Sequence, residues 1–366
     1  MTAATPVRPR LKSVTVNRSG THVVISRALE RIHLDDADGG LAALLALLAT
    51  GAHEPAVLAV ELARQGFPVT VEELTDVLAE LDRLGLLEQA DGDLALDPRT
   101  RERHRSNLRF YDLFANVGRT SADLQRAAMR SHVLILGAGG LGSGVVQALT
   151  GLGVARLTLV DFDVVEPGNL ARQFMYGMAT IGTPKVEAAC RWVESYSPDT
   201  DVVPVNRRIT DARSIVEVAG DAQLVVSAID TPEDIHLVVN EACFTLGVPY
   251  VVGGLNYSTL SYWSVAPGVS PCRRCLDLHR RDEEPTLPAA LRRDPILTAQ
   301  PVNRATGPVI QLASGLVSME AMRYLLGIEA PVAAATYQVL ELADGMATTR
   351  SPWRHHEECE LCPAQR

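Results

Sequence analysis

Apolar and polar positions alternate in the N-terminal part of the chain in a way that predicts short strands followed by helices. Residues 13–29, SVTVNRSGTHVVISRAL, hold two β-rich runs around Ser19 and Gly20, which predicts a β-hairpin. Helical patterns follow at residues 40–49, 54–66 and 70–85, and in the last of these Thr70 and Glu73 are placed to form a capping box. We expect a short β wing over residues 86–97. A hairpin, three helices and a wing predict a winged-helix domain over residues 1–97.

The pattern changes twice after this domain. Residues 97–114, DPRTRERHRSNLRFYDLF, are basic and polar and then aromatic, so residues 98–131 are expected to form a linker and the first helices of a new domain. From His132 the sequence HVLILG is a continuous apolar run typical of a buried strand. Further strands are predicted at residues 155–161, 201–206, 222–230 and 249–255. Because helical stretches separate them, residues 132–366 are predicted to be an α/β domain with a Rossmann-like, mostly parallel sheet.

The composition fits a globular protein. The chain has 366 residues, of which 47% are hydrophobic and 21% are charged, and its net charge is −10. An acidic chain is a poor general partner for nucleic acid, whose binding depends largely on Lys and Arg. The N-terminus has no signal-peptide core, and the most apolar stretch, residues 41–49, is too short to span a bilayer. A cytoplasmic protein without a membrane partner is therefore expected.

A glycine-rich turn, LILGAGGLGSG at residues 134–144, follows the first strand of the α/β region. Its G-x-G-x-x-G spacing lets a backbone turn tightly against a phosphate at the N-terminus of a helix. Asp161 ends the second predicted strand, where a carboxylate suits a ribose hydroxyl. Both a nicotinamide cofactor and ATP contain ribose, so these residues alone leave a dehydrogenase and an ATP-using enzyme open.

The residues after Asp161 favour ATP. Asn169, Arg172 and Gln173 lie within five residues, and Lys185 stands at the start of a predicted helix. Asp230 comes at the C-terminal end of a later predicted strand. Arg and Lys can neutralise phosphate charge and a carboxylate can hold Mg²⁺, which is what a triphosphate with its metal requires.

In these motifs the chain resembles the E1-like activating enzymes, which include the molybdopterin and thiamine adenylyltransferases and the catalytic halves of ubiquitin-type E1 proteins. The resemblance rests on GAGGLGS, DFDVVEPGNLARQF, GTPKVEAA and SAIDTPED and extends over about residues 105–366. It implies that Arg172 and Lys185 lie around the phosphates and that Asp230 serves Mg²⁺ and adenylate formation. The expected nucleotide-binding residues are Gly137, Gly139, Gly140, Gly142, Asp161, Asp163, Asn169 and Gln173.

The resemblance also implies a homodimer and an arginine that reaches the ATP of the neighbouring subunit. The family often has Arg-x-x-Arg followed by an amide residue before its first strand. Here the corresponding segment is RERHRSNLRF, in a different register. Arg105 is the first candidate, followed by Arg103 and Arg109, and a basic linker without this role is the alternative.

Four of the six cysteines form two C-x₂-C clips, the complement for a tetrahedral structural Zn²⁺. The predicted ligands are Cys272, Cys275, Cys359 and Cys362, with His355 or His356 as possible replacements for one thiol. Cys190 and Cys243 lie in apolar helical patterns and are expected to be buried. The predicted crossover segment, residues 280–309, contains no cysteine, so a thioester step like that of ubiquitin-type E1 enzymes is not expected.

The N-terminal domain is not expected to bind DNA, because its third predicted helix is strongly acidic. Residues 1–97 resemble instead the small peptide-recognition element of natural-product pathways, of the kind that assists pyrroloquinoline quinone biosynthesis. This resemblance implies that a precursor's leader peptide adds as a strand to the hairpin edge. A structural or dimerisation appendage is the alternative.

Together these features predict ATP-dependent adenylation of a carboxylate on a ribosomally made precursor peptide that binds through its leader. A downstream modifying enzyme would be a possible further partner. Two alternatives stay open beside the dehydrogenase. One is a non-catalytic E1-like scaffold that delivers the precursor to a cyclodehydratase. The other is an adenylyltransferase for a ubiquitin-like sulfur carrier protein.

Overall fold

The computed structural model describes residues 7–51, 53–284 and 304–362. Contacts divide the chain into two compact units, residues 1–126 and 127–366, and each is described by itself. Residues 98–126 therefore cluster with the small N-terminal domain. Within the described ranges, no helix is both long enough and apolar enough to cross a membrane.

The first unit begins with a small domain of strands and three helices. Its strands β2, β3 and β4 form an antiparallel sheet with β3 in the centre, and β1 pairs with β5. The elements are β1 Pro9–Leu11, β2 Thr15–Ser19, β3 His22–Arg27, β4 Glu30–Asp35, α1 Gly40–Thr50, α2 Pro55–Arg64, α3 Val71–Arg83 and β5 Leu87–Gln89. A short 3₁₀ helix, Gly92–Ala95, precedes α4 Pro98–Arg103, α5 Arg105–Tyr111 and α6 Ser121–Ala128.

Local sequence signals account for most of this unit. The predicted hairpin is β2–β3, and the three helical patterns are α1, α2 and α3. The capping box is confirmed, because Glu73 N donates to Thr70 Oγ1 at 3.2 Å and Thr70 N donates to Glu73 Oε2 at 2.9 Å. Leucines on the inner faces of the helices, such as Leu48 and Leu74, pack on β3 in one core.

The expected β wing at residues 86–97 is wrong. Leu87 is fully buried and its strand, β5, pairs with β1 from the start of the chain. Asp91 then turns the backbone at φ 58° into the 3₁₀ helix, so no return strand forms there. The unit also holds a strand that was not predicted, β4, on the outer side of β3. A winged-helix topology for residues 1–97 stays a prediction.

Helical residues after the small domain are tied to it by polar contacts. Lys12 Nζ donates to Ala115 O at 2.6 Å, and Val117 N donates to Asp82 Oδ1 at 3.1 Å. The segment between α5 and α6 thus contacts both the β1 region and the end of α3.

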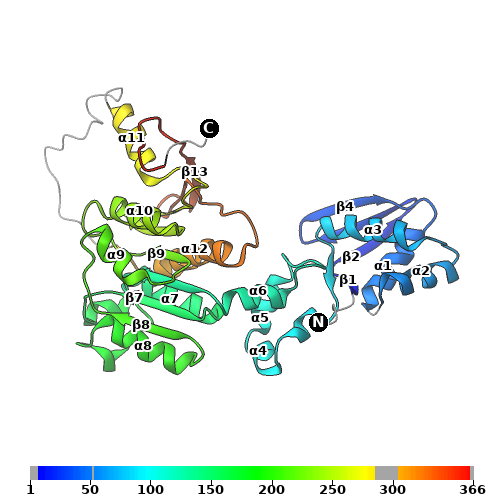
Figure 1. The fold of residues 1–366 in the computed structure, drawn as a ribbon, viewed down its shortest axis with the longest axis horizontal. Helices are drawn as coiled ribbons and strands as arrows, with labels where there is room; N and C mark the ends of the chain where they lie inside the picture. The colour runs from blue at the N-terminus through cyan, green and yellow to red at the C-terminus, as the bar shows by residue number, and fades with distance from the viewer. Residues whose placement is uncertain (1–6, 52, 285–303, 363–366) are drawn as a thin grey trace. The chain divides into compact units, whose positions relative to one another are not determined.

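The second unit is an α/β domain (Figure 1). Its eight-stranded sheet has the order β13-β12-β11-β10-β9-β6-β7-β8. Strands β10, β9, β6, β7 and β8 are parallel, and β11, β12 and β13 extend the sheet in antiparallel fashion. The predicted mostly parallel sheet is thus confirmed, but β11–β13 were not foreseen. The strands are β6 His132–Leu136, β7 Arg156–Val160, β8 Asp201–Val205, β9 Leu224–Ser227, β10 Tyr250–Asn256, β11 Thr259–Val265, β12 Thr336–Glu341 and β13 Ala347–Pro352.

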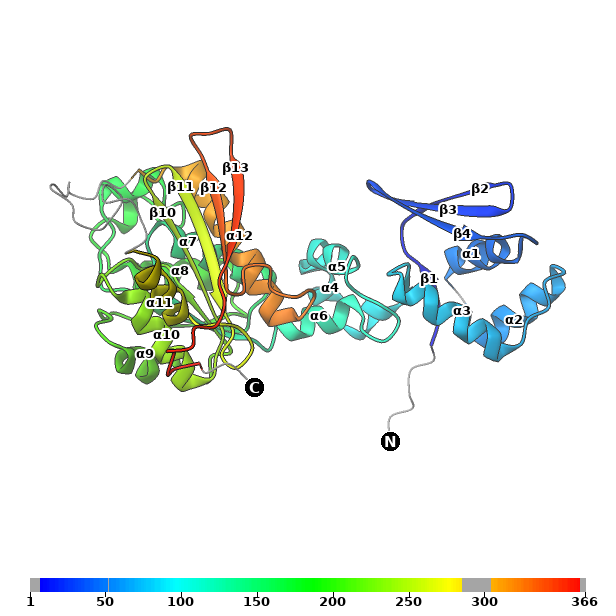
Figure 2. The same cartoon turned by 90° about the horizontal axis from the view of Figure 1, so that it is seen from above.

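Helices cover both faces of this sheet, as Figure 2 shows. Residues of α7, α8 and α12 pack on one face, and residues of α9, α10 and α11 pack on the other. Burial on both sides explains why β6 is a continuous apolar strand. The helices are α7 Gly140–Leu152, α8 Lys185–Tyr196, α9 Ala212–Ala219, α10 Ile235–Leu246, α11 Arg273–Glu283 and α12 Gly307–Leu326, with 3₁₀ helices at Pro167–Ala171 and Met178–Thr180.

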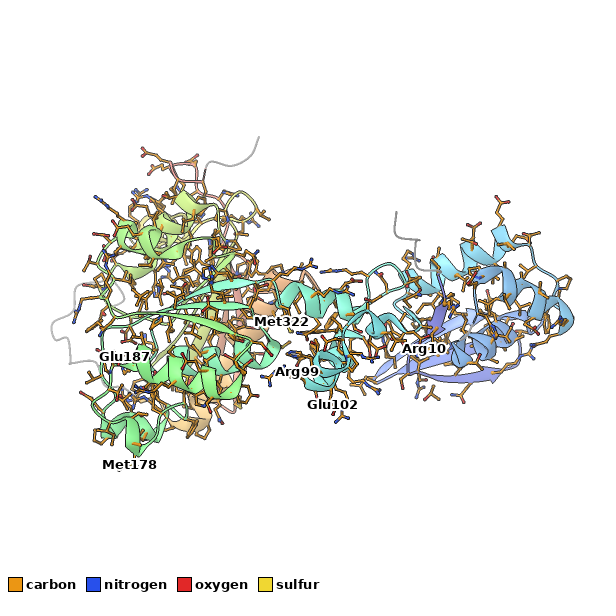
Figure 3. The ribbon with its side chains drawn as sticks, turned by 60° about the horizontal axis from the view of Figure 1, so that its bottom comes forward. Arg10, Arg99, Glu102, Met178, Glu187 and Met322 are labelled. Carbon is orange, nitrogen blue, oxygen red and sulfur yellow. The ribbon has the colours of Figure 1, made fainter. Side chains whose placement is uncertain are left out.

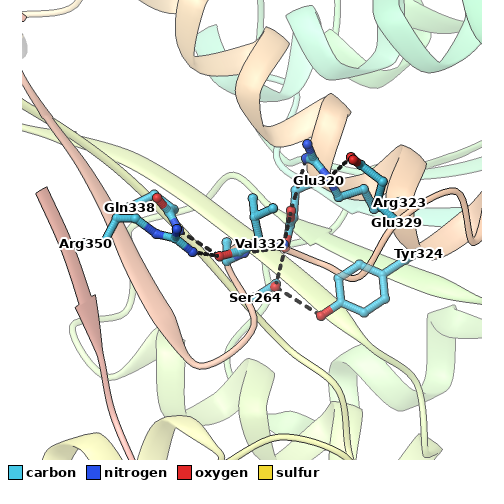
Figure 4. A network of polar contacts seen from close by, with 9 residues as sticks. Ser264, Glu320, Arg323, Tyr324, Glu329, Val332, Gln338 and Arg350 are labelled. Carbon is cyan, nitrogen blue, oxygen red and sulfur yellow. Dashed lines mark hydrogen bonds and ion pairs between the residues drawn. The ribbon is translucent and has the colours of Figure 1, made fainter. Parts of the chain in front are cut away.

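A buried carboxylate fixes α12 to the sheet (Figure 4). Glu320 is fully buried, and its Oε1 accepts from Ser264 Oγ at 2.8 Å and from Ala333 N at 2.9 Å. Its Oε2 accepts from Val332 N at 3.2 Å and lies 3.4 Å from Arg323 Nη1. One side chain of α12 therefore holds β11 and the segment before β12 in place.

Candidate functional site

The glycine-rich turn joins β6 to α7 at the C-terminal edge of the sheet. Gly137 has φ 96°, a conformation that favours glycine, and a Cβ there would lie 2.8 Å from Ala228 O. A Cβ on Gly142 would lie 1.8 Å from Gly137 O, so α7 can approach the turn this closely only without a side chain. A Cβ on Gly139 would meet nothing within 4 Å. The turn therefore leaves room for a ligand beside the N-terminus of α7.

Asp161 holds this turn. It follows β7 and is 9% exposed. Its Oδ2 accepts from Ala138 N at 2.6 Å and its Oδ1 accepts from Asp163 N at 2.8 Å. Each oxygen keeps a further lone pair for a ligand hydroxyl. The carboxylate expected at a ribose thus also organises the backbone of the glycine turn, a role that sequence reasoning missed.

Lys185 and Asp163 form an ion pair next to the turn. Lys185 begins α8, is 6% exposed and places Nζ 2.8 Å from Asp163 Oδ2. The Asp163 carboxylate is half-exposed, so the buried ammonium is directed toward the open side. Tyr176, which sequence reasoning did not select, donates its hydroxyl to Ala138 O at 2.8 Å. Burial raises the pKa of Tyr176 further above its usual value, and the neutral phenol is the donor in this bond.

Asn169 lies in the 3₁₀ helix Pro167–Ala171, and Arg172 and Gln173 follow that helix directly. Asn169 is 8% exposed and its Oδ1 accepts from Glu166 N at 3.0 Å, which ties it to its own turn. Arg172 is partly exposed and donates to Gly168 O at 3.2 Å. Gln173 is 2% exposed, and its Oε1 has no hydrogen-bond partner within the described part of the chain. A buried amide oxygen without a partner is costly, which makes Gln173 a candidate for contact with a bound group.

Asp230 lies at the same edge of the sheet. Strand β9 pairs with β6, Ala228 N donates to Leu136 O at 2.8 Å, and the next residues lead to an exposed Asp230. Ala228 itself abuts Gly137. The sheet therefore brings the glycine turn, Asp161 and Asp230 to the ends of three neighbouring strands.

Arg105 belongs to the other unit. It begins α5, and its Nη1 lies 3.4 Å from Glu102 Oε1, with both side chains about 70% exposed (69% and 72%). Figure 3 shows Glu102 projecting from α4. The expected approach of Arg105 to a neighbouring subunit's nucleotide stays a prediction.

The four clip cysteines come together as predicted. All are buried, and their Sγ atoms lie within 4.8 Å of one another. The Sγ–Sγ distance is 3.3 Å between Cys275 and Cys362, 3.5 Å between Cys272 and Cys359, and 3.7 Å between Cys359 and Cys362. Tetrahedral Zn²⁺ with Zn–S bonds of about 2.3 Å requires sulfurs roughly 3.8 Å apart, so the four thiols fit this metal.

The neighbouring histidines make other contacts. His356 Nε2 lies 2.8 Å from Asp282 Oδ2, and His355 Nδ1 lies 3.2 Å from Cys362 O. Four thiolates complete a tetrahedron, so neither histidine is needed as a ligand and no coordination position stays open for catalysis.

The clip is docked on α10 through Asn240, which is 1% exposed. Asn240 Oδ1 accepts from Arg273 N, next to the first clip cysteine, and from Tyr250 OH on β10, each at 2.8 Å. Trp353 Nε1 donates to Cys272 O at 3.0 Å. Sequence reasoning gave no signal for Asn240, because its partners lie on different elements.

The other two cysteines differ from each other. Cys243 is fully buried, as predicted, and burial raises its pKa. Cys190 is only partly buried, so that prediction was wrong: it sits on α8 near β8, an outer strand of the sheet, with Sγ 3.3 Å from Glu194 Oε1. The predicted cysteine-free crossover lies largely outside the described residues.

Residues 111–361 match the ThiF family. The chain belongs to the ThiF family. Among its curated relatives, the SAMP-activating enzyme E1 of Haloferax volcanii is 38% identical over 152 residues, 42% of this chain and 55% of the relative. The molybdopterin-synthase adenylyltransferase of Escherichia coli is 32% identical over 249 residues, 66% of this chain and 90% of the relative. The molybdopterin-synthase adenylyltransferase of Salmonella typhimurium is 36% identical over 157 residues, 42% of this chain and 61% of that relative. The chain thus spans less than two thirds of the Haloferax and Salmonella proteins that it matches.

Solved structures match along nearly the whole chain. The crystal structure of E. coli MccB superposes with a TM-score of 0.77 and 15% identity, and covers 98% of this chain and 97% of that one. The same protein with ATP, and in complex with N-formylated MccA as a microcin C7 biosynthetic enzyme, gives TM-scores of 0.73 and 0.74. At this identity the likeness shows a shared fold, which includes the N-terminal unit.

Proposed function

We propose that this chain binds ATP and adenylates a carboxylate, C-terminal or side-chain, of a ribosomally made precursor peptide. The observation that carries the proposal is the edge of the sheet at which the glycine turn, Asp161, the Lys185–Asp163 pair and Asp230 meet. Membership of the ThiF family supports adenylate chemistry, since relatives are adenylyltransferases. The full-length match to MccB supports a peptide substrate.

In the proposed reaction a carboxylate oxygen of the peptide bonds to the α-phosphorus of ATP, and the bond from that phosphorus to pyrophosphate breaks. The backbone N–H groups of the glycine turn, the Lys185 ammonium and the Arg172 guanidinium stabilise negative charge on the phosphates. Asp230 presents exposed carboxylate oxygens, which are suitable ligands for Mg²⁺. When bound, Mg²⁺ would neutralise charge on the leaving group.

The leader is proposed to bind the small domain by strand addition. In its three-stranded sheet β3 is central, so β2 and β4 are the strands with an unpaired side. Both are largely exposed, as an acceptor strand must be. We also propose a homodimer in which Arg105 reaches the neighbouring ATP, a structural Zn²⁺ at the four cysteines, and no thioester intermediate.

The test is ATP–pyrophosphate exchange by the full-length protein with and without candidate leader-bearing peptides. Exchange that requires peptide and is lost in Asp230→Ala supports the proposal. Asp201→Ala is the matched control. Asp201 begins β8, at the N-terminal ends of the parallel strands and so away from the proposed site, and it pairs with the exposed Arg156. Peptide binding without exchange indicates a delivery scaffold. Exchange with a ubiquitin-like carrier protein alone indicates a sulfur-carrier adenylyltransferase.

A further inference from the structure

The four-thiol cluster is closed on the side of its first clip and less so on the side of its second. The first clip, Cys272 and Cys275, is fully buried. Trp353, itself 7% exposed, covers it and donates to Cys272 O at 3.0 Å. In the second clip 4% of Cys359 and 6% of Cys362 are exposed. An ion that reaches the thiols from solvent therefore arrives from the side of the second clip.

A cavity of about 590 Å³ lies on that side, between α11 and the segment that carries the second clip. Cys359 is in its wall, and the other three clip cysteines are not. Charged residues line the cavity with Cys359: Arg274 and Arg281 from α11, and Glu357, Glu358 and Glu360 from the clip segment. The cavity thus connects one thiol of the cluster to solvent along a charged wall.

Two of the carboxylates in this wall are uncommitted. Arg281 is balanced on both sides, because its Nη2 lies 2.7 Å from Asp282 Oδ1 and 2.7 Å from Glu358 Oε2. Glu357 and Glu360 are exposed, and neither forms an ion pair within the part of the chain that the structure describes. They lie two residues before and one residue after Cys359. Oxygen ligands therefore stand free beside the thiol that faces the cavity.

We propose that this cavity is the path by which Zn²⁺ enters and leaves the four-thiol site, and that Glu357 and Glu360 bind the ion in transit. The inference rests on the proposed function in one respect, that the four cysteines hold Zn²⁺. Carboxylate oxygens are ordinary ligands of this metal. During loading, a Zn–O bond to a carboxylate breaks as the Zn–S bond to Cys359 forms, and the thiol proton passes to solvent. Release follows the same steps in reverse.

Residues on such a path have a kinetic signature that final ligands lack. In the completed site four thiolates fill the tetrahedron, so neither Glu357 nor Glu360 binds the metal there. Removal of the two carboxylates raises the barrier between the free and the bound ion without changing either state. The rates of loading and of release then fall by the same factor, and Kd stays constant.

The experiment measures metal exchange by the full-length protein under reducing conditions. Co²⁺ is the probe, because its tetrahedral thiolate complex absorbs visible light: loading is followed by stopped flow, and release by adding excess chelator. In Glu357→Gln/Glu360→Gln, which keeps the Arg281–Glu358 pair, both rates are expected to fall about 5-fold, the equivalent of roughly 1 kcal/mol for two exposed charges. Arg274→Gln removes a cation from the wall and is expected to raise both rates.

The matched control is Glu187→Gln/Asp201→Asn, which removes the same charge on α8 and β8. Unchanged rates in the double glutamate variant overturn the path, and so does an equal slowing in the control, which would show an effect of net charge alone. Faster release without slower loading also overturns it, because the glutamates would then stabilise the bound metal. A wild-type protein that binds neither Co²⁺ nor Zn²⁺ overturns the path and the structural metal together. ATP–pyrophosphate exchange tests the proposed adenylation separately.

Discussion

Asp161→Asn tests whether one carboxylate organises the nucleotide edge. Its two oxygens accept backbone hydrogen bonds of 2.6 and 2.8 Å, from Ala138 on the glycine turn and from Asp163. Asparagine has nearly the same shape but only one acceptor oxygen. Its NH₂ group must therefore face one of the two N–H donors, so one hydrogen bond is lost and the other loses its charge.

The size of the effect follows from these two bonds. Hydrogen bonds to a charged group contribute about 1.5–3 kcal/mol each, and a buried N–H without an acceptor costs about 1–3 kcal/mol. Since the asparagine in the Asp161→Asn variant keeps one neutral hydrogen bond, the expected total loss of free energy is about 2–4 kcal/mol. If the turn stays formed, this free energy is lost from the stability of the second unit. If the turn opens instead, ATP affinity falls by about 30- to 700-fold.

Both quantities can be measured separately. All three tryptophans, Trp192, Trp263 and Trp353, lie in the second unit, so their fluorescence during urea unfolding reports that unit alone. ATP affinity comes from calorimetry. Asp201→Asn, at the opposite edge of the sheet, is the control and is expected to change neither quantity. The losses of unfolding free energy and of ATP-binding free energy in Asp161→Asn are added. If the sum is below about 0.5 kcal/mol, the Asp161 carboxylate does not hold the turn.

Three further outcomes are expected. Glu320→Gln removes one acceptor oxygen from a fully buried side chain. In the same fluorescence assay it should lower the unfolding free energy of the second unit by about 2–3 kcal/mol. An unchanged urea midpoint would contradict the network in Figure 4. Treatment with a chelator, or the substitution Cys272→Ser, should remove zinc from the purified protein and lower the urea concentration at which tryptophan fluorescence reports unfolding. A zinc-free protein of unchanged stability would refute the structural role. Burial, helped by the hydrogen bond to Glu194, raises the pKa of Cys190 to about 11 and so favours the neutral thiol. Alkylation of Cys190 should therefore be slow at pH 8, become faster as the pH approaches 11, and be faster in Glu194→Gln than in the wild type. Fast alkylation of the wild type at pH 8 would contradict this environment.

Features encoded by local spacing were predictable from the sequence. Thr70 and Glu73 fix the start of α3 because a capping box needs only four consecutive residues. The clips at Cys272 and Cys359 were recognisable because two thiolates three residues apart already form half of a metal site. The buried strand β6 was evident from its unbroken apolar run.

Features created by distant contacts were not predictable in this way. Strand β5 pairs with β1 across more than seventy residues of sequence, so a local reading of residues 86–97 produced a wing. Tyr176 supports the glycine turn through a hydroxyl that reaches Ala138, 38 residues earlier. Strand β11 carried one usable signal, the turn-type residues Asn256 and Ser258 between two β-rich runs. In the structure the chain turns there, with Tyr257 at φ 56°, and β10 and β11 form a hairpin.

Helix α10 adjoins both of the proposed ligand sites. Its N-terminal end follows the segment that carries Asp230, and Asn240, farther along the helix, holds the cysteine clip through the N–H of Arg273. Two ligands that order the same helix are thermodynamically linked, and such linkage is reciprocal. Whatever factor a metal at the clip adds to nucleotide affinity through α10, a bound nucleotide adds to the affinity for the metal.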